Sequence, residues 1–189
     1  MLNRIQQVRE TLGFAISTRI FLFSVLTGAI AGLAAVAFTA LVELARFACI
    51  EWAAGFSQLR PPGEFHFDFS TVANRAPDEH LWLLLLLPAL GGVTSGWLAW
   101  RWAPEAHGPG TGAVIDAFHN HRGVLRGVAA PVKALATIVT LATGGSAGKE
   151  GPVMHIGASL GSWLAARLGL SAAQRRILLL AGCAGGLGA

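Results

Sequence analysis

The chain has 189 residues, of which 53% are hydrophobic and 13% charged, and its formal net charge at pH 7 is +4. Soluble domains carry roughly 25% charged residues, so this composition predicts an integral, multi-pass membrane protein. The basic residues stand at the ends of apolar segments and form no stripe, which argues against nucleic acid as a partner. Cys49 and Cys183 lie far apart among apolar residues, so we expect no disulfide, no metal site and no cofactor.

The first part of the chain predicts a short segment followed by a long membrane helix. We expect residues 1–17 to form a cytoplasmic amphipathic segment, and residues 18–50 to form the first membrane helix. The stretch 20–42 carries no charge. It is long enough to span roughly 30 Å of hydrocarbon, and too long for the apolar core of a cleaved signal peptide.

A polar loop and a second membrane helix follow. Residues 56–79 are rich in proline, phenylalanine and acidic side chains, and residues 80–102 contain a second long stretch without charge. Positive residues favour the cytoplasmic side of a membrane. The distribution of arginine therefore places the N-terminus inside, the loop outside and the region 101–126 inside.

The remaining apolar segments are short and are separated by glycine and proline. We expect helices at 111–120, 124–142, 150–167 and 172–187. Several of these are too short to cross a bilayer, and interrupted helices of this kind are typical of transporter ion sites. Glycine pairs four residues apart predict close helix packing; these pairs are Gly28/Gly32, Gly92/Gly96, Gly157/Gly161 and Gly182/Gly186.

Two glycine-rich breaks are the candidate site. The sequences GPGTG at 108–112 and GKEGP at 148–152 each provide flexible backbone followed by the start of a helix. Free N–H groups at a helix start bind anions without a full positive charge, which permits release. The candidate anion-binding residues are Gly108, Pro109, Gly110, Thr111, Gly112, Gly148, Lys149, Glu150, Gly151 and Pro152.

Glu150 is the most informative of these residues, because charges at membrane depth are costly and usually functional. A carboxylate at a helix start is itself a favoured ligand of that start. Two alternatives stay open at this point: a structural charge paired with Lys149 or His155, and an acid/base pair of Glu150 with His155 in a membrane-embedded enzyme. A phosphate-binding loop is excluded, because Thr143 stands where its first glycine belongs.

Several motifs of the chain resemble those of CLC chloride channels and proton-coupled anion exchangers. They are the sequences APEAHGPGTG at 103–112, PVK at 131–133, GKEGP at 148–152, HIGA at 155–158 and GCAGGLGA at 182–189. The resemblance covers roughly residues 20–189 and implies an all-α, polytopic membrane fold. By it, residues 18–189 form the first part of an inverted-repeat fold with broken and tilted helices, ending before the second inverted half.

The resemblance also implies a function, which is anion transport by a channel or by proton-coupled exchange, and not enzymatic catalysis. Glu150 is then the gating glutamate, whose carboxylate occupies the outer anion site until protonation or a competing anion displaces it. Lys149 adds positive potential for an incoming anion. The implied partners are chloride or another small anion, protons, membrane lipid and a second copy of the full-length protein, in a prokaryotic plasma membrane with a cytoplasmic N-terminus.

The chain departs from the family pattern in ways that limit these expectations. The family motif reads Gly-Ser-Gly-Ile-Pro. In this chain Pro109 stands at the Ser position, and Thr111 and Gly112 replace Ile and Pro. Proline offers neither a hydroxyl nor an N–H, so anion selectivity does not carry over. We expect an N-terminal fragment without the family's inner proton glutamate, which leaves channel and exchanger open. The alternative is a truncated, non-transporting membrane fragment with a structural or regulatory role.

Overall fold

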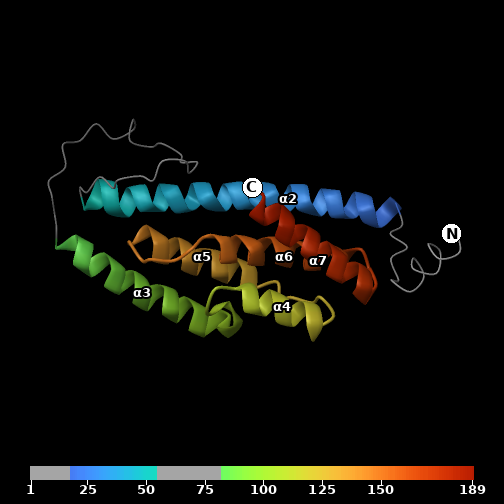
Figure 1. Ribbon diagram of the computed structural model, residues 1–189. Helices are drawn as coiled ribbons and strands as arrows, with labels where there is room; N and C mark the ends of the chain where they lie inside the picture. Colours follow the sequence, from blue (N-terminus) through green and yellow to red (C-terminus); the bar gives the residue numbers. More distant parts are fainter. Residues whose placement is uncertain (1–17, 55–81) are drawn as a thin grey trace, which may run out of the picture.

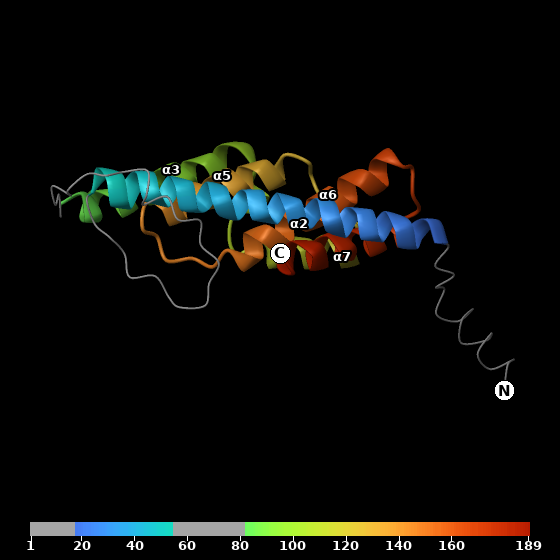
Figure 2. The ribbon, with the colours of Figure 1, turned by 90° about the horizontal axis from the view of Figure 1, so that it is seen from above.

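The structure is a computed structural model that describes residues 18–54 and 82–189, shown in Figures 1 and 2. The regular elements within these two ranges are helical, as the sequence predicts. The amphipathic segment expected in 1–17 and the polar loop expected at 56–79 lie outside the described residues. Two helical segments, Thr18–Ala53 and Leu83–Trp102, are long and apolar enough to cross a membrane by length and composition.

Helix α2, Thr18–Arg46, continues into a wider π-helical segment, Phe47–Ala53, labelled η1. Together they confirm the first predicted membrane helix and extend it by three residues beyond the expected end. One stripe of α2 is buried, with successive members four, four, three and four residues apart: Thr27, Ala31, Ala35, Phe38 and Val42. This spacing puts them on one helix face, and that face packs against α5, α6 and α7. Figures 1 and 2 both show α2 running along these helices.

Helix α3, Leu83–Trp102, confirms the second predicted membrane helix and packs against α5. Its contact with α5 is close at Gly91, where a Cβ atom would collide with the side chain of Thr143. The predicted close packing at Gly92 and Gly96 is wrong within the described part of the chain, since a Cβ at either position meets open space. Spacing alone does not tell which face of a helix has a neighbour.

Two short elements and one corrected boundary follow α3. A 3₁₀ turn, η3 at Pro104–Ala106, leads to α4, Thr111–His119. Helix α5 covers Ala129–Ala142, so the predicted helix at 124–142 begins five residues too early. A side chain of α6 stabilises residues 124–128 as a loop. The Ser162 hydroxyl accepts the Leu125 N–H at 3.1 Å and donates to the carbonyl of Gly123 at 2.7 Å.

Helices α6, Glu150–Arg167, and α7, Ala172–Leu187, have the predicted bounds. Helix α7 begins with a capping box, in which Ser171 accepts the Gln174 N–H and the Gln174 side chain accepts the Ser171 N–H. The two helices touch backbone to backbone, since a Cβ on Gly182 would collide with the carbonyl group of Gly157. The predicted close packing of these small residues is therefore confirmed.

Candidate functional site

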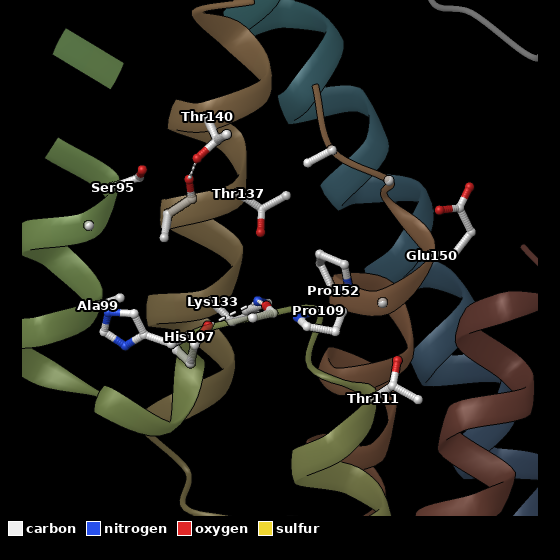
Figure 3. Close-up of a pocket in the computed structure, with 17 residues that line it drawn as sticks. Ser95, Ala99, His107, Pro109, Thr111, Lys133, Thr137, Thr140, Glu150 and Pro152 are labelled. Atoms are coloured by element: carbon white, nitrogen blue, oxygen red, sulfur yellow. Dashed lines mark hydrogen bonds between the residues drawn. The ribbon is translucent and has the colours of Figure 1, made fainter. Parts of the chain in front are cut away.

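The two glycine-rich breaks border one cavity of about 460 Å³. Helix α3 and helix α5 form its other walls, as Figure 3 shows. Its lining is Ser95, Gly96, Ala99, Ala106, His107, Gly108, Pro109, Thr111, Lys133, Ala136, Thr137, Thr140, Ala147, Gly148, Glu150, Gly151 and Pro152. The start of α4 and the start of α6 thus meet at the same space, although they are about forty residues apart in the chain.

The backbones of the two breaks lie in direct contact, and glycine is what permits it. A Cβ on Gly151 would collide with the carbonyl oxygen of Pro109. A Cβ on Gly110 would lie 3.3 Å from the carbonyl oxygen of Gly151 and 3.2 Å from the Cβ of His155. Gly110 also has φ 92°, a left-handed conformation that side chains disfavour. The sequence GPGTG is therefore suited to bring the start of α4 against the start of α6.

Buried polar side chains bind the carbonyl groups of the first break. The Lys133 ammonium, on a residue that is 6% exposed, donates to the carbonyl of Ala106 at 2.9 Å and to that of Gly108. The His155 Nδ1 lies 3.4 Å from the carbonyl oxygen of Gly110, and this side chain is fully buried. Alternate carbonyls of the segment are thus held by α5 and α6. Lys133 also brings a full positive charge to the cavity wall.

The polar face of α5 forms a wall of the cavity that was not predicted from the sequence. Lys133, Thr137 and Thr140 are four and three residues apart, which places them on one face of an apolar helix. All three line the cavity. Two features of the sequence could have indicated this wall. One is a lysine inside an apolar segment, because such a charge is usually functional. The other is the pair of threonines that follows the lysine at helical spacing.

Glu150 is the first residue of α6 and its side chain is exposed. The carboxylate lies over the preceding glycine, because a Cβ on Gly148 would collide with Glu150 Oε2. Figure 3 shows it at the cavity edge, directed away from Lys133 and Thr137. The ion pairs found in residues 18–54 and 82–189 include none between Glu150 and His155, so the structure gives that form of the paired-charge alternative no support.

Most of the predicted anion-binding residues meet at this cavity. Those that line it are Gly108, Pro109, Thr111, Gly148, Glu150, Gly151 and Pro152. Gly110 is packed behind it between Gly151 and His155. Gly112 and Lys149 do not belong to the lining. The sequence thus located the two backbone walls of the cavity and missed the side-chain wall from α5.

Residues 91–189 match the family model described as voltage gated chloride channel. A chloride/fluoride channel protein of Pseudomonas syringae pv. tomato is 28% identical over 109 residues, covering 58% of this chain and 24% of that protein. The H(+)/Cl(-) exchange transporter ClcA of Salmonella arizonae is 36% identical over 111 residues, with the same coverage of 58% and 24%. The chain thus spans about a quarter of the length of these curated relatives.

The crystal structure of a slow cyanobacterial Cl-/H+ antiporter resembles this structure with a TM-score of 0.64 and 22% sequence identity. The similarity covers 92% of this chain and 37% of that one. At this level of identity it bears on the fold, and it confirms the predicted all-α membrane architecture.

Proposed function

We propose that this chain, which belongs to the voltage gated chloride channel family, carries part of a pathway for chloride or another small anion across a membrane. The observation that carries the proposal is the cavity at which both glycine-rich breaks meet, with Glu150 at its edge and Lys133 in its wall. The names of its relatives, a chloride/fluoride channel and an H(+)/Cl(-) exchange transporter, support the same class of substrate.

The lining of the cavity favours a small anion on electrostatic grounds. The first N–H groups of α4 and α6 have no intrahelical acceptor, and helix starts carry a partial positive charge. The Lys133 ammonium is bound to neutral carbonyl groups, which leave its net charge in place. Partial charges together with one buried cation attract an anion, and they bind it weakly enough for passage.

In the proposed mechanism Glu150 competes with the transported anion. Its carboxylate sits at the start of α6, and a small rotation would bring it to the N–H groups that an anion would use. A carboxylate in that position blocks the pathway, whereas its protonation or a high anion concentration displaces it. Lys149, which precedes it, adds positive potential where the anion enters. This arrangement couples anion passage to protons.

We further propose that residues 18–189 lie in the membrane and that the protein works as a homodimer in a prokaryotic plasma membrane, with residues 1–17 in the cytoplasm. The outer faces of the two long helices support lipid contact. Leu33 of α2 is 73% exposed, and Leu85 and Val93 of α3 are 84% and 71% exposed. Large apolar side chains so exposed are suited to a lipid environment and costly in water.

The test is chloride efflux from liposomes that contain the full-length native gene product, measured between acidic and neutral pH. Wild-type flux is expected to change with pH, and flux through Glu150→Gln is expected to be independent of pH. Asp116→Asn is the matched control, because this exposed carboxylate lies outside the cavity and its loss leaves the pH dependence intact. Wild-type pH dependence in Glu150→Gln would contradict the gating role, and absence of wild-type flux would contradict transport.

A further inference from the structure

Thr137 lies in the cavity wall, and its hydroxyl has no hydrogen-bond partner among the described residues. The residue is 7% exposed and lines the cavity from the middle of α5. Figure 3 shows its side chain between α5 and Pro152. Across residues 18–54 and 82–189, the hydrogen bonds of the structure include none to the Thr137 hydroxyl.

Two other threonines inside these helices donate their hydroxyls to the backbone of the same helix. The Thr140 hydroxyl, one turn further along α5, donates to the carbonyl of Ala136 at 2.8 Å. The Thr27 hydroxyl donates to the carbonyl of Phe23 at 2.6 Å. This bond to the carbonyl four residues back is the usual solution for a helical threonine. Thr137 does not adopt it, so its hydroxyl remains available to a ligand in the cavity that it lines.

The residues around Thr137 favour an anion as the ligand of its hydroxyl. Lys133 lies one helical turn away on the same face and brings a positive charge. Pro109, in the opposite wall, has neither a hydroxyl nor an N–H to donate. A threonine hydroxyl is a donor as well as an acceptor, so it can point its hydrogen at an anion that the nearby ammonium attracts. A cation at the same place would be repelled by Lys133.

We infer that the Thr137 hydroxyl is a side-chain donor to a halide-sized anion in this cavity. The inference rests on the proposed function, and it adds a residue of the α5 wall that contributes to the affinity of the cavity for the anion. Peptide N–H groups of the two breaks would approach the anion from one side and the Thr137 hydroxyl from the other. Thr140 would not contribute, because its hydrogen is already donated to the backbone.

The experiment is chloride binding to the purified full-length gene product, measured by isothermal titration calorimetry. Thr137→Val keeps the branched shape and removes the hydroxyl, and it is expected to lower chloride affinity by about 10-fold or more, as for a hydrogen bond to a charged group. Thr137→Ser keeps the hydroxyl and is expected to retain most of the affinity. Thr27→Val is the matched control, because this buried helical threonine lies outside the cavity, and it is expected to bind like wild type.

The outcomes distinguish a failure of the proposed function from a failure of the role inferred for Thr137. If wild type does not bind chloride, both the proposed function and the inference fall. If wild type binds and Thr137→Val binds equally well, the inference alone is overturned. It is also overturned if Thr137→Ser weakens binding as much as Thr137→Val, or if Thr27→Val does, because either result would show that the lost affinity does not come from the Thr137 hydroxyl.

Discussion

The contact between α6 and α7 gives a sharp prediction for Gly182→Ala. The added methyl group would meet the carbonyl oxygen of Gly157 and lie 2.7 Å from its carbonyl carbon. Both atoms belong to the backbone of a helix, so no side-chain rotation can relieve the collision. The two helices must therefore separate, which loosens the packing along their whole length.

Two opposing terms set the size of the effect. Replacing a helical glycine by alanine stabilises the folded state by roughly 0.5–1 kcal/mol. Overpacking a tight contact costs about 1–3 kcal/mol. The balance for Gly182→Ala is a net loss of about 1–2 kcal/mol in the free energy of unfolding, which lowers Tm by about 2–4 °C for each kcal/mol.

The assay is thermal unfolding of the full-length gene product in detergent, followed by fluorescence of its tryptophans. Gly92→Ala is the control, because a Cβ there meets nothing within 4 Å in the described structure, and it is expected to raise Tm slightly. A Tm for Gly182→Ala equal to or above that of wild type would refute the backbone contact.

Three further substitutions have expected outcomes. Lys133→Met removes the donor to two buried carbonyls and the charge of the cavity wall, so we expect weaker chloride binding by calorimetry and a loss of about 2 kcal/mol or more in chemical unfolding. Ser162→Ala leaves the Leu125 N–H and the Gly123 carbonyl unpaired and is expected to cost about 1–3 kcal/mol, measured as a lower Tm. Ser171→Ala removes the α7 cap and is expected to cost about 1 kcal/mol, seen in helix unfolding by circular dichroism. Unchanged stability in any of the three would contradict the corresponding contact.

The helices that were predicted best carry local start signals. Helix α7 follows Ser171 with Gln174 three residues later, and this pair forms a capping box in the structure. Helix α6 follows a glycine-rich break and has Pro152 in its first turn. The start of α5 was misplaced because Ser162, on a different helix, holds the preceding loop. Such a long-range contact leaves no mark in the local sequence.

The candidate site was likewise predicted only in part. Its two backbone walls were predicted, because glycine, proline and Glu150 are informative wherever they occur in an apolar chain. The wall from α5 was not, because a polar side chain becomes part of a site only once the face it occupies is known. Thr137 and Thr140 look alike in the sequence, and only their hydrogen bonding distinguishes them.

An anion is proposed to bind where the two breaks and α5 meet. The most direct measurement is anomalous X-ray scattering from crystals of the full-length gene product grown with bromide, a heavier substitute for chloride. We expect a bromide peak inside the cavity, within hydrogen-bond reach of the Thr137 hydroxyl and the first N–H groups of α6. A cavity without bromide, in crystals whose bromide peaks lie elsewhere on the protein, would contradict it.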